Sequence, residues 1–393
     1  MARKNGRKKI NWGQVLSLAM FLVLGGGLGV WFAWYNDTRG LDTWPFGGSF
    51  LLFLPLLAGF IAALYGQIII HEAGHLVFGL LSGYRFSSFR IGSLMWVKEN
   101  GRLRFRRLSL AGTGGQCLMA PPPMVDGGFP HRLYNLGGSL MNVLAGLLFL
   151  ALHLALRHVP VLSILLLITA LIGFFFALMN GLPMRLGLVD NDGMNALSLG
   201  KHPEALRAFW LQLTMNARLA QGQRLRDMPE EWFKVPDDEA MTNSIVAALG
   251  VIAASRLMDE RKFDEADGLM AHLLAIPSAV AGLHRGLLVS DRIFIELIGE
   301  NRPQVVAGML GKNQQKFMQA MKGFISILRT RYALALLMNK DEKKAGQWLA
   351  RFEKAAKSYP YPSDVVAERE LIALVQRKAQ EKEGAMRPVP APL

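Results

Sequence analysis

The hydrophobic positions of the chain are unevenly distributed: the first half carries long apolar runs, and the second half mixes apolar with charged positions. A helix needs about 20 apolar residues to cross a bilayer core, so each run of that length predicts a transmembrane helix. The runs predict four spans, over residues 12–35, 46–84, 133–156 and 159–184. Only Arg157 and His158 separate the last two spans, which predicts a tight helical hairpin.

The second half has the pattern of helices that pack in water. Segments 248–277 and 331–360 each show apolar residues at helical spacing, a polar break, and a second helix that ends at a proline. Ala266 and Ala345 hold matching positions 79 residues apart, which is about twice the tetratricopeptide period. The pattern resembles tetratricopeptide hairpins, but both matches are degenerate, so an irregular helical bundle is the alternative.

The segment between the second and third spans carries strand signals. It contains "SLMWVKENGRLRFRRLSL" (93–110), in which Asn100-Gly101 is the strongest short hairpin signal. Leu103 and Phe105 alternate with arginines after the turn, which predicts a strand with one apolar face. The hairpin therefore offers strand edges on which an extended peptide can be held.

A loop rich in glycine and proline follows the hairpin. Its sequence is "AGTGGQCLMAPPP" (111–123), and these residues do not suit a regular element. Irregular backbone at membrane depth is tolerated where it is buried in protein or lines a water-filled cavity. We therefore expect a re-entrant loop that returns towards the membrane and places Gly114 and Gly115 near a substrate.

The charge of the chain, +14, indicates orientation. Five basic residues without an acid precede the first span, and eight lie in segment 84–132, whereas each of the two remaining loops has one arginine. Basic loops stay in the cytoplasm, so both termini are expected there, in the cell membrane of a bacterium. The sequence shows no nucleic-acid motif, and its single cysteine, Cys117, excludes an internal disulfide and a thiolate metal cluster.

The second span contains the motif "HEAGH" (71–75), and ionisable residues inside a span mark a functional site. His71 and His75 are four positions apart, share one face of a helix, and can bind one metal ion. Glu72 follows the first histidine and is placed to take a proton from water activated by the metal. A polar cluster without a metal is the alternative.

A third ligand is available after the fourth span, in "MNGLPMRLGLVDNDGMNAL" (179–197). The chain must return to the depth of the histidines, so the span is expected to break near 180–183 and fold back. Asp190 and Asp192 are the two candidates. Asp192 is favoured because Gly193 permits a tight turn after it, whereas Asp190 can instead cap the next helix.

These motifs together, with "GGSLMN" (137–142) in the third span, resemble the site-2 protease family over roughly residues 50–197. The resemblance implies an intramembrane zinc metallopeptidase with one Zn²⁺ per chain and a substrate that is single-span or otherwise membrane-anchored. It implies His71, His75 and Asp192 as zinc ligands and Glu72 as the catalytic base. Serine replaces the family's proline in "GGSLMN", and the stretch from Pro183 to the aspartate is longer than usual.

The expected fold is mostly α: a polytopic membrane protein with about four transmembrane helices, a small cytoplasmic β-hairpin with the re-entrant loop, and a soluble helical domain. The domains are residues 1–45, 46–197 (with 84–125 and 133–184 as its hairpin-loop and helical parts), 198–380 and a disordered tail, 381–393. The candidate substrate contacts, from the resemblance and from the hairpin and loop, are Asn142, Asn180, Pro183, Leu103, Phe105, Gly114 and Gly115. The expected partners are the substrate, the lipid bilayer, and a protein or second copy at the helical domain.

Two other functions compete with this interpretation. A membrane metallopeptidase of the prenyl-protein or heat-shock type needs a glutamate as third ligand, but Glu204, Glu230 and Glu231 lie in soluble-looking sequence. A membrane-anchored adaptor with a vestigial metal site is the non-enzyme alternative. All four expected groups of the site are present, which favours the protease.

Overall fold

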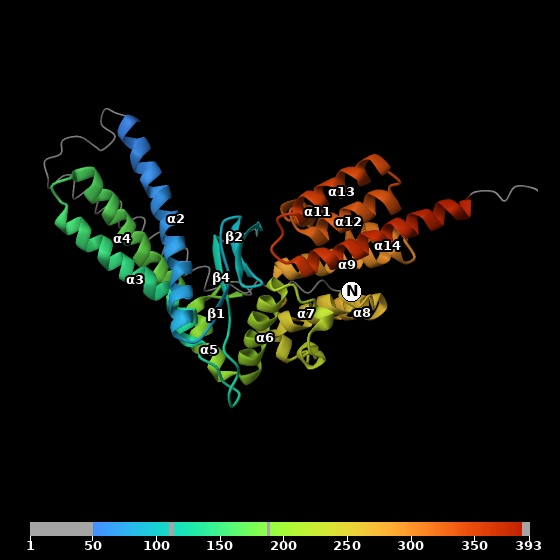
Figure 1. Cartoon of the computed structure of the whole chain (residues 1–393), viewed down its shortest axis with the longest axis horizontal. Helices are drawn as coiled ribbons and strands as arrows, with labels where there is room; N and C mark the ends of the chain where they lie inside the picture. The colour runs from blue at the N-terminus through green and yellow to red at the C-terminus, as the bar shows by residue number, and fades with distance from the viewer. Residues whose placement is uncertain (1–49, 110–113, 187–188, 387–393) are drawn as a thin grey trace, which may run out of the picture. The chain divides into compact units, whose positions relative to one another are not determined.

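The structure is a computed structural model that describes residues 50–109, 114–186 and 189–386 (Figure 1). Over these residues the chain forms α-helices α2 to α14 and two antiparallel sheets. Its contacts divide it into two compact units. Of the described residues, the first unit comprises 50–83 and 129–202 without 187–188, and the second comprises 84–128 without 110–113, and 203–386. The expected first span, 12–35, lies outside the described residues.

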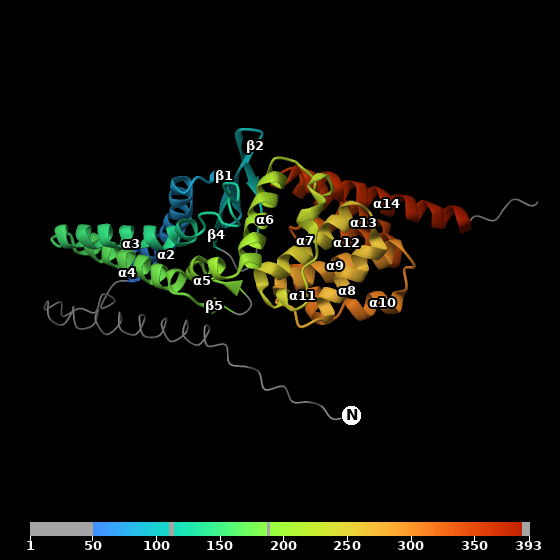
Figure 2. The same cartoon turned by 90° about the horizontal axis from the view of Figure 1, so that it is seen from below.

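The first unit is built on three long apolar helices that pack against one another (Figure 2). They are α2 (Phe50–Leu81), α3 (Arg132–Ala155) and α4 (Pro160–Gly181). The stretches Leu57–Leu81, Arg132–Ala155 and Pro160–Gly181 are long and apolar enough to cross a membrane. The described part of the chain therefore contains three of the four expected spans.

The burial pattern of α3 is that of a helix surrounded by lipid. Its buried residues are small or polar: Tyr134, Asn135, Gly137, Gly138, Ser139, Asn142, Gly146 and His153. Its exposed face carries leucines such as Leu144, Leu147 and Leu148. In lipid, helices associate through close packing of small residues and through hydrogen bonds, because leucine gains nothing by leaving the lipid tails. The unit therefore has an interior suited to a polar site.

The fourth expected span ends as predicted, and the chain folds back. Helix α4 ends at Gly181, and the short strands β5 (Arg185–Leu186) and β6 (Val189–Asp190) pair antiparallel. Helix α5 (Asp192–Ser198) follows, and the 3-10 turn Leu199–Lys201 closes the unit.

The second unit contains a four-stranded antiparallel sheet with the strand order β3-β2-β1-β4. The strands are β1 (Arg85–Ile91), β2 (Leu94–Glu99), β3 (Arg102–Arg107) and β4 (Gly115–Ala120). Asn100 and Gly101 connect β2 to β3 with φ angles of 48° and 78°, as a type I′ turn requires. The predicted hairpin is confirmed.

One expectation for this segment is wrong. Residues 115–120 were expected to be irregular, but they form β4, in which Cys117 and Met119 are buried and which pairs with β1. Pairing with a strand some 30 residues away supplies the regularity that the local glycines do not predict. Leu103 and Phe105 alternate with arginines along β3 as expected, and they are 62% and 50% exposed.

The rest of the second unit is helical. Its helices are α6 (Pro203–Ala220), α7 (Ser244–Asp259), α8 (Phe263–Ala275), α9 (Gly282–Ile298), α10 (Pro303–Met309), α11 (Lys312–Ala320), α12 (Ile325–Ala333), α13 (Glu342–Ala356) and α14 (Pro362–Met386). Short 3-10 turns lie at Leu225–Asp227, Glu230–Phe233 and Ala240–Thr242, and a π-helical stretch, Leu334–Met338, follows α12.

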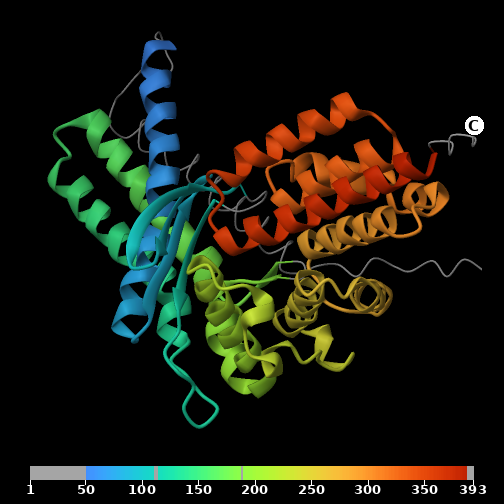
Figure 3. The ribbon, with the colours of Figure 1, turned by 45° about the vertical axis from the view of Figure 1, so that its right-hand side comes forward.

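Helices α7 and α8, and α12 and α13, pack as the two predicted hairpins (Figure 3). Ala266 and Ala345 are buried within them, at 0% and 2% exposure. Helix α9, however, is followed by two short helices instead of one partner, so the tetratricopeptide assignment stays a prediction. Helix α14 runs to Met386, past the expected start of the disordered tail at 381, and residues 387–393 lie outside the described chain.

Candidate metal centre

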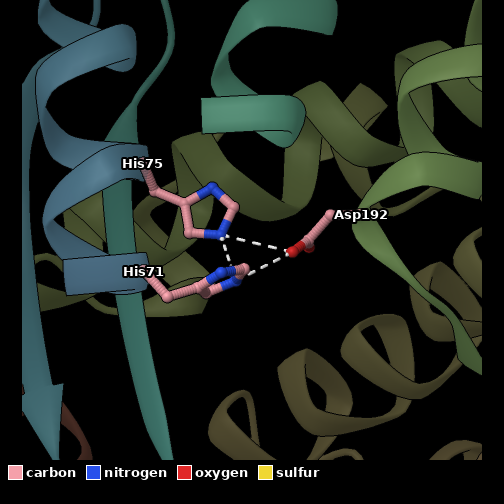
Figure 4. A group of neighbouring side chains, drawn as sticks. All are labelled: His71, His75 and Asp192. Atoms are coloured by element: carbon pink, nitrogen blue, oxygen red, sulfur yellow. Dashed lines mark hydrogen bonds and ion pairs between the residues drawn. The ribbon is translucent and has the colours of Figure 1, made fainter. Parts of the chain in front are cut away.

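Three side chains of the first unit converge on one point: His71 and His75 from α2, and Asp192 from the start of α5 (Figure 4). The His71 Nε2 and His75 Nε2 atoms lie 3.1 and 3.4 Å from Asp192 Oδ2, and 3.2 Å from each other. Ligand atoms held about 2.0–2.1 Å from a tetrahedral zinc ion lie roughly 3.3 Å apart. The three atoms therefore have the spacing of a three-ligand zinc site with a fourth position left for water or substrate.

Hydrogen bonds orient both imidazole rings. His71 Nδ1 lies 2.7 Å from Asn142 Oδ1, and His75 Nδ1 lies 2.8 Å from the Tyr134 carbonyl oxygen. An oxygen acceptor requires that Nδ1 carries the proton, which leaves the Nε2 lone pair of the neutral ring for a metal. Both rings are thus fixed in the tautomer that a zinc ligand needs.

A chain of amides behind His71 fixes Asn142 in turn. Asn142 Nδ2 donates to the Gln67 carbonyl oxygen at 3.0 Å and to Gln67 Oε1 at 2.8 Å. A backbone carbonyl only accepts, so this contact identifies the nitrogen end of the carboxamide. Gln67 Nε2 then donates to the Thr169 carbonyl of α4 at 3.0 Å. Gln67 and Asn142 are both fully buried, and together they link all three long helices to His71.

The position of Asp192 depends on Asn191, which caps α5. The Asn191 side chain accepts from the N–H groups of Met184 and Met194 at 3.0 and 2.9 Å, and donates to the carbonyls of Met179 and Leu182 at 2.8 and 2.6 Å. One carboxamide therefore ties the end of α4 to the start of α5. Asp192 becomes the first residue of α5, where the helix dipole favours a carboxylate.

The charge of Asp192 is set by its neighbours. Burial raises the pKa of this carboxyl, but the imidazoles of His75 and His71, when they are protonated, lower it more through their charge and their hydrogen bonds, so its pKa then lies well below its usual value. Asp192 is therefore an ionised carboxylate and can act as a metal ligand.

Glycines allow the close approaches at this site. A Cβ at Gly193 would lie 2.1 Å from the Gly181 carbonyl oxygen, and a Cβ at Gly138 would lie 2.5 Å from the His71 ring. Gly193 is inside α5. The expectation that it forms a tight turn is wrong, and its role is to let α5 lie against the end of α4.

Asp190 lies apart from the histidines. Its carboxylate binds Arg185 across the β5–β6 hairpin, with Arg185 Nε 2.8 Å from Asp190 Oδ1. The cap expected from Asp190 is supplied by Asn191. The structure thus brings Asp192, and not Asp190, to the two histidines.

The remaining predicted residues have separate surroundings. Glu72 is buried and directly follows His71 in α2, and it is not a member of the metal-binding group. Asn180 Nδ2 donates to the Phe176 carbonyl of its own helix at 3.1 Å, and Pro183 is exposed after α4. Leu103, Phe105, Gly114 and Gly115 belong to the second unit.

The glutamates of the competing metallopeptidase hypothesis are also in the second unit. Glu204 lies at the start of α6, and Glu230 and Glu231 lie in a 3-10 turn. Within the described residues, none of the three belongs to a group that could hold a metal, and Asp192 takes the third position instead.

Sequence analysis did not identify Gln67, Tyr134 or Asn191 as part of the site. Gln67 had a detectable signal, because a polar amide one turn before His71 interrupts an otherwise apolar span. Tyr134 contributes its backbone carbonyl and a ring contact with His75, at 5.7 Å between ring centroids, and the sequence carries no signal for either.

Comparison with known protein families shows which family has this combination of motif and helices. The comparisons with curated proteins and with solved structures give no match. Residues 60–252 match the family model described as Peptidase M50B-like, and this region contains the "HEAGH" part of α2, helices α3 and α4, and Asp192. The family and the three apolar helices indicate a membrane metalloprotease. Residues 60–252 of this chain are therefore a peptidase M50B-like domain of the site-2 protease family.

Proposed function

We propose that the chain is an intramembrane zinc metalloendopeptidase that cleaves membrane-anchored or single-span proteins within or near the bilayer. The observation that carries this proposal is the tetrahedral spacing of the three ligand atoms inside a unit of membrane-length apolar helices. The family match supports the reaction class. An adaptor with a vestigial site has no use for two buried histidines that are both held in the metal-binding tautomer.

His71, His75 and Asp192 would hold the ion, with one Zn²⁺ per chain. Zinc bound there would polarise the scissile carbonyl and lower the pKa of the attacking water. The Glu72 carboxylate accepts the proton of that water and delivers it to the leaving amine nitrogen. Burial of Glu72 and both histidines excludes bulk water, which strengthens the electrostatic interactions among these groups.

Asn142 acts as a positioning residue for His71. The resemblance implied a substrate contact, but both hydrogens of the Asn142 amide are already donated to Gln67, and its oxygen accepts from His71. Asn180 and Pro183 remain substrate contacts in this proposal, because they lie at the break between α4 and β5.

The substrate is presented in an extended form, because a peptide bond inside a helix is shielded from attack. Strand β3 is an edge of the four-stranded sheet, and its Leu103 and Phe105 side chains are exposed. A substrate strand can pair with such an edge and use these side chains for specificity. Gly114 and Gly115, before and at the start of the other edge strand, β4, are the further substrate contacts in this proposal.

The protein lies in the cell membrane of a bacterium as a multi-pass protein with both termini in the cytoplasm. The excess of Lys and Arg in segments 1–11 and 84–132 supports this orientation. The helical domain contacts a protein partner or a second copy of the chain.

The test is cleavage of candidate single-span proteins co-expressed with wild type or with Glu72→Gln. The variant should lose all cleavage and retain about one zinc per chain, because Glu72 is not a ligand. His71→Ala should lose both zinc and cleavage. Cleavage by purified Glu72→Gln protein would contradict the assignment of the base.

A further inference from the structure

A cavity of about 430 Å³ lies inside the second unit. Helices α6, α7, α9 and α12, the start of α14 and residues of the sheet line it. Its apolar wall includes Ile252, Met258, Leu287 and Leu288. The volume is within the range of about 300–1,000 Å³ that is typical of ligand sites.

The charged lining of this cavity has an excess of carboxylates. Its acidic residues are Asp259, Asp291, Asp364, Glu368 and Glu370, and its arginines are Arg224, Arg261 and Arg329. Each arginine is already bound to an acid: Arg224 to Glu370 at 2.6 Å and to Asp259 at 2.5 Å, Arg261 to Glu370 at 2.9 Å, and Arg329 to Asp291. Glu370 also pairs with Arg226 at 3.7 Å. Asp259, Asp291 and Glu370 are therefore all matched by arginines, and the excess of carboxylates comes from Asp364 and Glu368.

Two of the carboxylates lack adequate partners. Within the part of the chain that the structure describes, the Asp364 carboxylate makes no hydrogen bond or ion pair. Glu368 Oε2 is buried without a hydrogen bond, and its nearest cation is Arg329 Nη1 at 3.4 Å. Burial raises the pKa of Asp364 and of Glu368 to about 7. Burial also lowers the pKa of His284, so this cavity imidazole is neutral and supplies no charge.

A ligand group that fits this cavity has an apolar stem, which packs on the apolar wall, and a cationic end, which pairs with Asp364 and Glu368. Lysine and arginine side chains have this form, because their methylene groups pack on apolar walls while the charged end seeks an anion. The chain as a whole carries a net charge of +14, so an anionic cavity is where a basic segment would bind in preference to the rest of the molecule.

We propose that this cavity binds a lysine or arginine side chain of a second protein, from the basic segment that follows a transmembrane helix on its cytoplasmic side. Such segments are rich in Lys and Arg in membrane proteins generally. That this second protein is a substrate rests on the proposed function, whereas its binding to the cavity does not.

The test uses the full chain in detergent, in the Glu72→Gln background so that nothing is cleaved. The probe is a fluorescein-labelled twelve-residue peptide with four lysines, compared with a peptide that has glutamine at those four positions. Fluorescence anisotropy should give at least about tenfold tighter binding of the lysine peptide. Asp364→Asn combined with Glu368→Gln should remove most of that difference, about tenfold.

A matched control and a second variant separate binding from folding. Glu353→Gln removes a carboxylate that pairs with Arg369 on the surface of α13, at 44% exposure, and should leave the peptide affinity unchanged. Ser326→Lys places a cation in the cavity wall from α12 and should abolish peptide binding. Circular dichroism should show the same helical content for all variants.

Three outcomes would overturn the proposal. Equal affinity of the lysine peptide for wild type and for both cavity variants would place its binding elsewhere on the surface. Binding that strengthens tenfold when residues 2–9 are deleted would identify the chain's own basic segment as the occupant, instead of a second protein. If the wild-type chain cleaves single-span substrates but its Glu72→Gln form shows no preference for the lysine peptide, this inference alone is refuted. If the lysine peptide is preferred through Asp364 and Glu368 but the wild-type chain cleaves no substrate, the proposed function alone is refuted.

Discussion

Helix α3 of the first unit and helix α9 of the second bury different kinds of side chain. The buried residues of α3 are glycines, Ser139, Asn142 and other polar groups, with leucines outside. The buried residues of α9 include Leu288, Ile293, Phe294 and Leu297. In lipid the apolar side chains gain nothing by burial, whereas in water their burial is the main source of stability. The first unit is thus stabilised mostly by close packing and hydrogen bonds, and the second by its apolar core.

The two units also differ in how completely their buried polar groups are hydrogen-bonded. In the first unit, the ring nitrogens of both histidines and the amide of Asn142 have partners, and the arrangement forms a metal site. In the second unit, Asp364 and Glu368 lie in a cavity with incomplete partners. The polar groups of the first unit therefore surround the candidate metal position, whereas Asp364 and Glu368 of the second unit line a cavity that is large enough for a ligand.

The largest effect is expected from the third ligand of the first unit. Asp192→Ala removes one of three ligand atoms and should abolish both zinc binding and activity. Asp190→Ala breaks only the ion pair with Arg185, so zinc content should be retained. Metal analysis of the purified variants measures both effects, and the reverse order would move the ligand to Asp190.

Truncation of a large apolar side chain to alanine should destabilise the second unit much more than the first. Phe352 of α13 is fully buried in the core of the second unit, and Phe352→Ala should lower the free energy of unfolding by about 3–5 kcal/mol. Leu147→Ala on the exposed face of α3, at 53% exposure, should change it by less than about 0.5 kcal/mol. Hydrogen–deuterium exchange of α13 and of α3 reports each unit separately. A large effect of Leu147→Ala would show that α3 buries this face against protein.

The amide chain behind His71 should have a smaller effect on the metal. Asn142→Leu removes the acceptor of His71 Nδ1 and should weaken zinc binding by about 10–100-fold. Gln67→Leu leaves that acceptor in place but frees Asn142 to turn, so about tenfold is expected. Competition with a zinc chelator measures the affinity, and the visible spectrum of the cobalt-substituted protein reports ligand geometry. An unchanged zinc affinity in both variants would show that the Asn142 and Gln67 amides support the packing of the helices but do not affect metal binding.

The sequence predicted much of this site because its signals are local. An HExxH motif fixes two ligands on one helix face, and a polar residue in an apolar run is conspicuous, so His71, Glu72 and His75 were accessible. Asp192 was favoured over Asp190 for a reason that the structure does not support. Gly193 permits a close approach between α5 and Gly181, and the local sequence says nothing about such an approach.

The features that the sequence did not predict depend on distant partners. Strand β4 exists because β1 pairs with it, and β1 was itself not recognised in "RFSSFRI". The glycines near β4 argued for a loop, but tertiary pairing overrode that local preference. The same limitation applies to the cavity, whose five carboxylates come from α7, α9 and α14 and have no common motif.

The smallest expected effect concerns the exposed edge of the second unit. Leu103 and Phe105 lie on β3, 62% and 50% exposed, and contribute little to the core. Leu103→Ser combined with Phe105→Ser should therefore leave zinc content and unfolding unchanged. If a substrate strand pairs with β3, loss of these two apolar contacts should raise KM by about three- to tenfold with kcat nearly constant, because the contacts act equally in the ground state and the transition state. Steady-state cleavage of a single-span substrate measures both constants. An unchanged KM would show that the edge strand takes no part in substrate binding, and a fall in kcat with constant KM would show that these residues act on the chemical step.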